Sequence, residues 1–143
     1  AMLGVECVVI DRDAIRRGDD VLAFLENNKI DYVVLAGFLR LMPSCVVDAF
    51  KGRIINIHPA LLPTYGGKGM YGDNVHKAVI EAGEKESGIT IHHVTENYDE
   101  GAAIAQVKCV VEPSDDFESL AERIHALEYE HFPKVIEEEL RKI

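Results

Sequence analysis

Two polar residues stand at the end of a short β-branched run, where an amide and an imidazole could act on a carbonyl compound. Residues 53–57 predict a strand, and Pro59 ends it because proline donates no hydrogen bond to a sheet. Side chains alternate along a strand, so Asn56 and His58 point one way while Ile57 points into the packing. An amide can hydrogen-bond a developing oxyanion, and an imidazole exchanges a proton near neutral pH. A structural role is the alternative: a histidine satisfied by a backbone carbonyl, and an asparagine in the following turn.

Asp99, in a loop between two later predicted strands, is a candidate carboxylate partner for the imidazole. It lies in residues 97–101, just before a glycine, and aspartate is common in such turns. A carboxylate beside His58 would instead favour the imidazolium form and raise its pKa. The residues alone do not choose between Asp99, Glu96 and Glu100.

The other histidines show no spacing typical of a metal site. His92 and His93 are adjacent on a predicted strand, so they face opposite sides and cannot both enter one site. His76, His125 and His131 fall on predicted helices, where surface or packing roles are the default. Three or four converging ligands are needed for a structural or catalytic metal, and no H-E-x-x-H or comparable motif supplies them. No metal is predicted.

Composition excludes several classes of protein. The chain has 143 residues, enough for one domain spanning residues 1–143, and a formal net charge of −10. The chain has no basic cluster larger than a pair such as Arg16-Arg17, so nucleic acid is not an expected partner. No run approaches the ~20 apolar residues of a membrane span, and the first residues do not read as a signal peptide. Three unpaired cysteines, Cys7, Cys45 and Cys109, suit a reducing cytoplasm.

The order of predicted elements indicates an α/β protein. Strands are expected at residues 5–10, 32–36, 53–57, 89–94 and 104–111. Helices are expected at about residues 20–28, 43–50 and 73–82 and from residue 114 onward, with Pro133 ending or kinking the last one. The apolar run at 32–36 is typical of a strand buried on both faces of a parallel sheet. We therefore predict three layers: a mostly parallel sheet with helices on both faces and an antiparallel edge.

A glycine-rich stretch at residues 64–72 contains Lys68 and invites comparison with a phosphate-binding loop. The G-x-x-x-x-G-K-[ST] spacing of that loop is absent, so a nucleoside triphosphate site is not predicted. The stretch is interpreted as a surface loop.

The run Asn56-Ile57-His58-Pro59-Ala60-Leu61-Leu62-Pro63, followed by Asp99-Glu100-Gly101, resembles the signature of the folate-dependent formyltransferases. The similarity extends from about residue 3 to the C-terminus. It implies a formyltransferase-like fold with Asn56, His58 and Asp99 as catalytic residues. It also implies transfer of a formyl group from 10-formyltetrahydrofolate, a cosubstrate, to the amine of glycinamide ribonucleotide in de novo purine biosynthesis.

The resemblance also implies binding roles, carried over position by position. The expected folate-binding residues are Leu39, Arg40, Leu41, Met42, Asn56, His92, Val94, Thr95, Glu96, Asn97, Tyr98 and Asp99. The expected ribonucleotide-binding residues are Pro59, His125, Ala126, Leu127 and Glu128, with Glu128 as the partner of the ribose hydroxyls.

Two departures from the family pattern keep alternatives open. Family members open with a Gly-x-Gly-Ser-Asn-type loop for the substrate phosphate, and nothing here matches it, so the domain is expected to be N-terminally incomplete. The loop at 65–74 is also longer than in the simplest members. A formyltetrahydrofolate hydrolase is one alternative, although Pro59 stands where hydrolases tend to carry a second histidine. A non-catalytic folate-binding fragment is another. A homodimer is among the assemblies left open.

Overall fold

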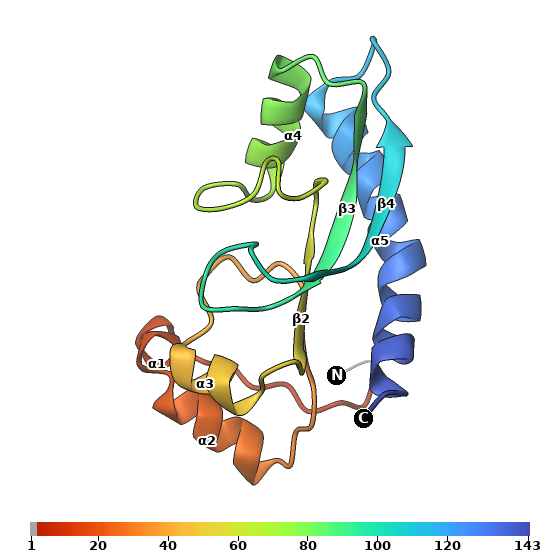
Figure 1. The fold of residues 1–143 in the computed structure, drawn as a ribbon. Helices are drawn as coiled ribbons and strands as arrows, with labels where there is room; N and C mark the ends of the chain where they lie inside the picture. The colour runs from red at the N-terminus through yellow and green to blue at the C-terminus, as the bar shows by residue number, and fades with distance from the viewer. Residues whose placement is uncertain (1–2) are drawn as a thin grey trace.

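The computed structural model describes residues 3–143, which form five helices and four strands in the part of the chain so described. In chain order these are α1 (Arg12–Arg17), α2 (Asp19–Asn27), β1 (Val33–Leu35), α3 (Ser44–Ala49), β2 (Ile54–His58), α4 (Asp73–Glu81), β3 (Glu86–His93), β4 (Ala103–Val110) and α5 (Phe117–Leu140). Figure 1 shows α1, α2 and α3 gathered around one end of β2, while α5 runs along β3 and β4.

The strands form one mixed sheet in the order β1-β2-β3-β4. β1 pairs with β2 in parallel, whereas β2–β3 and β3–β4 are antiparallel. The α/β class and the antiparallel edge are confirmed. Only one of these three pairings is parallel, so the parallel part of the sheet is smaller than expected. β3 and β4 are joined by one short loop, which permits only an antiparallel pair.

β2 separates two apolar clusters, which places helices on both faces of the sheet. Ile54 packs with apolar residues of α2, α3 and their flanks, among them Val21, Val46 and Phe50. The next residue, Ile55, packs on the other face with β3 and α5. This alternation is the period-two geometry of a strand, and it leaves Asn56 and His58 on the same face as Ile54. The expected three layers are confirmed by these two clusters.

Near the N-terminus one strand prediction is wrong and another is confirmed only in part. Residues 5–10 form neither a strand nor a helix, and Val9 is 92% exposed. A strand requires a hydrogen-bonding partner, and within residues 3–143 none pairs with this segment. β1 is shorter than predicted and is not buried on both faces, since Val34 is 39% exposed. Within the described chain β1 has β2 on one side only.

Two helices also differ from the predictions made from the sequence. α1 is not among the expected helices, and the Asp11 carboxylate caps it by accepting from Ala14 N at 2.8 Å. α5 does not end at Pro133 but continues to Leu140. Phe132 and Val135 are buried on either side of the proline, and their packing against the sheet holds the helix together across it. Among residues 3–143, no helix has the length and apolar character to cross a membrane.

Candidate active site

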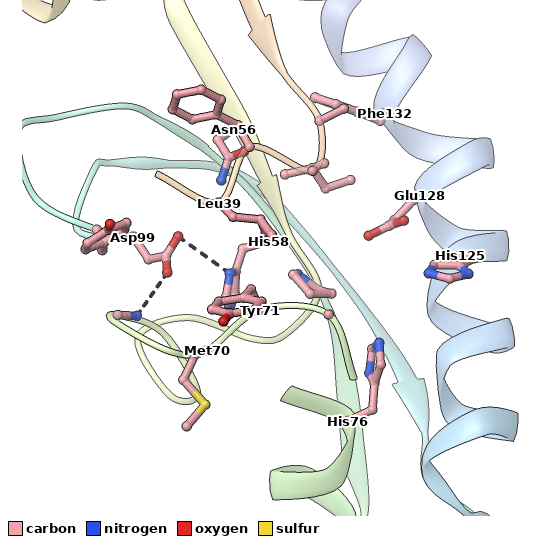
Figure 2. A pocket seen from close by; sticks show the side chains of 18 of the residues that line it. Leu39, Asn56, His58, Met70, Tyr71, His76, Asp99, His125, Glu128 and Phe132 are labelled. Carbon is pink, nitrogen blue, oxygen red and sulfur yellow. Dashed lines mark hydrogen bonds and ion pairs between the residues drawn. The ribbon is translucent and has the colours of Figure 1, made fainter. Parts of the chain in front are cut away.

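A cavity of about 750 Å³ opens beyond the carboxyl ends of β1 and β2. In α/β sheets this is the usual position of a ligand site. Its walls come from the loop after β1, the end of β2, the glycine-rich loop, the loop after β3 and one side of α5. The lining residues include Phe38, Leu39, Asn56, His58, Pro59, Met70, Tyr71, His76, Tyr98, Asp99, His125, Glu128 and Phe132, most of which Figure 2 labels.

His58 is held between two hydrogen-bond acceptors. Its ring is 4% exposed, with Nε2 2.7 Å from the Tyr65 carbonyl oxygen and Nδ1 3.5 Å from Asp99 Oδ1. A carbonyl only accepts, so Nε2 carries a hydrogen. Burial lowers the pKa of His58, and the Asp99 charge and the Tyr65 carbonyl oppose that effect without cancelling it. Asp99 thus raises the pKa of His58 as expected, but the net pKa is lowered because burial has the larger effect.

Asp99 is the carboxylate that reaches His58. Its Oδ2 accepts from Gly67 N at 2.9 Å, and its Oδ1 lies 3.5 Å from both His58 Nδ1 and His92 Nε2. Burial works to raise the pKa of Asp99, but the neighbouring His92, the backbone N–H of Gly67 and the nearby His58 outweigh it, so the pKa is lowered. Asp99 is therefore ionised at neutral pH. Figure 2 shows it directed at His58 from the loop after β3.

The position of Asp99 depends on a close backbone approach at Gly101. A Cβ placed on Gly101 would stand 1.6 Å from the His93 carbonyl oxygen, so no larger residue fits without moving the backbone. Asp99 itself has φ of 56°, the left-handed region that non-glycine residues adopt mainly in tight turns. The loop therefore packs against the end of β3, and the Asp99 carboxylate lies next to His58 at the end of β2.

The buried hydroxyl of Thr90 holds the segment that follows His58. Thr90 Oγ1 donates to the Ala60 carbonyl at 2.7 Å and accepts from Leu62 N at 3.0 Å. Gln106 Nε2 donates to the same hydroxyl at 3.0 Å and to the Leu62 carbonyl at 2.8 Å. β3 and β4 therefore fix the path of the chain as it leaves the catalytic histidine candidate.

The expected folate-binding residues divide into two groups. Leu39, Asn56, Tyr98 and Asp99 line the cavity. The others lie outside its lining: Arg40, Leu41, Met42, His92, Val94, Thr95, Glu96 and Asn97. Met42 is buried in the apolar cluster beside α2 and α3, and Val94 packs against that cluster. Both face the core because they flank the strands rather than the open end of the sheet.

His92 stands behind the cavity wall instead of in it. Its ring is 2% exposed, with Nε2 3.3 Å from Asn56 Nδ2 and Nδ1 2.8 Å from the His93 carbonyl oxygen. The residue therefore touches the catalytic candidates and not the cavity.

The expected ribonucleotide-binding residues are brought together only in part. Pro59, His125 and Glu128 line the cavity. Residues three and four apart share a helix face, so His125 and Glu128 lie on one side of α5 with Phe132. Ala126 and Leu127 lie on other faces, and Leu127 packs against the main core. Burial raises the pKa of Glu128, and His125 opposes the shift.

Sequence reasoning missed two parts of the wall. His76 on α4 is 2% exposed, lines the cavity and has no hydrogen-bond partner for Nδ1. Burial is the main cause of its lowered pKa. Its spacing of three from buried Val79 was the available signal. The glycine-rich loop, interpreted as a surface loop, supplies Met70 and Tyr71 to the same cavity.

Within residues 3–143, no group of three or more His, Cys, Asp or Glu side chains is arranged to hold a metal ion.

The fold and the Asn56, His58 and Asp99 constellation define a class of protein. The sequence profile described as "Formyl transferase" matches residues 12–136, and the chain belongs to that family. It is 47% identical over 117 residues to the "Phosphoribosylglycinamide formyltransferase, chloroplastic" of Arabidopsis thaliana, an alignment covering 82% of this chain and 40% of that one. The chain therefore spans less than half the length of that relative.

Solved structures show the same likeness. A phosphoribosylglycinamide formyltransferase from Streptococcus pneumoniae TIGR4 superposes with a TM-score of 0.85 at 31% identity, over 95% of this chain and 75% of that one. A formyltetrahydrofolate deformylase from Pseudomonas syringae pv. tomato superposes with a TM-score of 0.70 at 26% identity, over 83% of this chain and 37% of that one.

Proposed function

We propose that this chain carries the catalytic part of a phosphoribosylglycinamide formyltransferase, which moves a formyl group from 10-formyltetrahydrofolate to the amine of glycinamide ribonucleotide. The observation that carries the proposal is the buried His58 on the cavity wall, 3.5 Å from the Asp99 carboxylate and beside Asn56. The names of the relatives support the choice of substrate.

The chemistry requires stabilisation of one oxyanion and the movement of one proton. The substrate amine attacks the formyl carbon, a C–N bond forms, and the bond from that carbon to the folate nitrogen breaks. Asn56 and protonated His58 hydrogen-bond the developing oxyanion, an effect worth about 3–4 kcal/mol per donor in comparable sites. The proton lost by the amine reaches the folate nitrogen, with ionised Asp99 holding the charge of His58. No covalent enzyme intermediate is needed.

The Tyr65 carbonyl has a definite place in this scheme. It accepts the Nε2–H of His58 at 2.7 Å, and Asp99 faces the other ring nitrogen. An oxyanion that binds His58 through Nε2 must take the position of the Tyr65 carbonyl. The proposal therefore requires the segment around residue 65 to shift when both substrates are bound.

The cavity has the size and lining that two small-molecule substrates need. Ligand sites commonly have volumes of about 300–1,000 Å³, and this one has about 750 Å³. We assign the side formed by Leu39 and Tyr98 to the folate. We assign the side formed by Pro59, His125 and Glu128 to the ribonucleotide, with Glu128 accepting from ribose hydroxyls. Figure 2 shows Glu128 and His125 across the cavity from Asp99.

The test is deformylation of a 10-formyl folate analogue, followed by absorbance with and without glycinamide ribonucleotide. Wild type is compared with His58→Ala and with His131→Ala, a histidine outside the cavity. We expect amine-dependent turnover that falls at least about 100-fold in His58→Ala and persists in His131→Ala. Turnover without the amine would identify a hydrolase. Folate binding without any turnover would identify a non-catalytic fragment.

We also propose the cytoplasm as the compartment, with small molecules as partners and no role for nucleic acid or membrane. The net charge of −10 disfavours contact with a phosphate backbone. Since the Arabidopsis relative is named as chloroplastic, cell fractionation is the deciding measurement. Sedimentation of the purified chain tests for a homodimer.

A further inference from the structure

We propose that His92 is a positioning residue: as a neutral imidazole with its hydrogen on Nδ1, it orients the Asn56 amide and leaves the Asp99 carboxylate to His58. The inference rests on the proposed function, since it assigns His92 a part in the same reaction. It is carried by three contacts of one buried ring.

The first contact determines which nitrogen of His92 carries the hydrogen. Nδ1 lies 2.8 Å from the His93 carbonyl oxygen. A carbonyl oxygen accepts and never donates, so Nδ1 must be the donor. The ring is 2% exposed, so bulk water cannot replace the carbonyl oxygen as the partner of Nδ1. In the neutral ring, Nε2 is then a hydrogen-bond acceptor.

The second contact gives that acceptor its donor. Nε2 of His92 lies 3.3 Å from Asn56 Nδ2 and 3.5 Å from Asp99 Oδ1. The carboxylate cannot donate when ionised, whereas an amide NH₂ donates two hydrogens. Asn56 therefore turns its NH₂ toward His92. Because Asn56 lines the cavity, the second amide hydrogen can serve a substrate oxygen there.

The third contact shows why the charge of His92 matters. Asp99 Oδ1 is 3.5 Å from His58 Nδ1 and 3.5 Å from His92 Nε2, so two imidazoles face one carboxylate oxygen. A proton on His92 Nε2 would make it a donor to Asp99 and would repel the NH₂ of Asn56. It would also oppose the proton on His58: burial is the main reason for the lowered pKa of His58, and His92 acts in the same direction. The working state has the proton on His58 alone.

A pair of substitutions separates positioning from simple packing. The amide of a glutamine reaches the place of an imidazole Nε2, and the amide of an asparagine reaches the place of Nδ1. His92→Gln can thus still accept from Asn56, whereas His92→Asn keeps only the group that meets the His93 carbonyl. We expect kcat to fall about 100-fold in His92→Asn and less than 10-fold in His92→Gln. KM for the folate analogue should be unchanged, because His92 does not line the cavity.

The control is His93→Gln, which changes the neighbouring side chain on the opposite face of β3 and should leave kcat unaltered. Equal losses of kcat in His92→Asn and His92→Gln would overturn the inference. So would a rise in KM without a change in kcat.

A measurement without turnover keeps this inference distinct from the proposed function. Nitrogen-15 NMR of the histidine rings reports the tautomer directly, and we expect His92 to carry its hydrogen on Nδ1 at pH 7. The titration midpoint of His58 should move to higher pH in His92→Gln, because a competing imidazole has been removed. A hydrogen on Nε2 of wild-type His92 would overturn the inference even in an active enzyme. Absence of formyl transfer with the expected NMR result would overturn only the proposed function.

Discussion

His58 shows how burial and a charge compete at a single residue. The ring is enclosed, which lowers its pKa, yet both nitrogens face acceptors that favour the protonated form. The pKa of His58 is lowered overall, and without the Asp99 charge it would be lower still. The carboxylate therefore keeps a larger fraction of His58 protonated near neutral pH. Removal of that carboxylate should therefore reduce activity without a loss of fold.

We predict that Asp99→Asn lowers the rate of formyl transfer by about 100- to 10,000-fold. The amide oxygen can still accept from Gly67 N, so the loop should keep its shape. The pKa of His58 should fall further, because the Asp99 charge that raises it has gone. Steady-state kinetics and histidine NMR check both effects. The matched control is Glu100→Gln, one residue along; comparable loss there would show that general loop charge, and not Asp99, is responsible.

At the scale of elements, the strand after α4 shapes the active-site loop through one hydroxyl. Thr90 is fully buried and satisfies backbone groups of Ala60 and Leu62, which lie 30 and 28 residues away. A buried polar group left without its partner costs about 1–3 kcal/mol. The loop after His58 is therefore coupled to the stability of the sheet.

We predict that Thr90→Val lowers the free energy of unfolding by about 1–3 kcal/mol, since Leu62 N and Gln106 lose their acceptor. Urea unfolding followed by circular dichroism measures the change. Thr90→Ser keeps the hydroxyl and should retain most of the stability. If the serine variant loses as much as the valine variant, the methyl packing and not the hydrogen bonds carries the effect.

α5 illustrates a failure of local rules at the same scale. Proline lacks an N–H and clashes with the carbonyl four residues earlier, so Pro133 predicts a helix end or a kink. The helix nevertheless continues for seven residues to Leu140. Phe132 and Val135 belong to the main apolar cluster, and burial of two such side chains is worth about 1.5–3 kcal/mol each. Tertiary packing outweighs the local preference.

At the scale of the whole molecule, two buried histidines make stability depend on pH. The pKa values of His58 and His76 are lowered by burial from the ordinary value of 6.5. Below that pH the unfolded chain binds protons that the folded chain resists. The slope of unfolding free energy against pH is then positive. Their stabilising effect is full above about pH 6.5 and is lost as the pH falls toward the lowered values.

We predict that the free energy of unfolding falls between pH 7.5 and pH 5, as measured by urea unfolding at fixed salt. His76→Leu should make this fall shallower, because one of the two histidines no longer takes up a proton on unfolding. It should not reduce stability at pH 7.5 by the full cost of a core truncation, since Nδ1 of His76 has no partner to lose. An unchanged slope in the variant would contradict the role given to His76.

The sequence by itself determined the features that depend on local periodicity. Alternation along residues 53–58 placed Asn56 and His58 on one face of β2, and helical spacing identified four of the five helices. The order of these elements was enough for the α/β class. The family motif named the catalytic candidates without any coordinates.

Only the tertiary structure decided which distant segments meet. Asn56 and His92 are 36 residues apart in the chain and touch because β2 and β3 pair at that point. Asp99, and not Glu96 or Glu100, reaches His58 because Gly101 lets the loop close onto β3. The cavity includes His76 and excludes Met42 for the same reason: each side chain's direction is set by packing between elements. Such contacts are determined by burial across the whole chain, and no window of neighbouring residues contains that information.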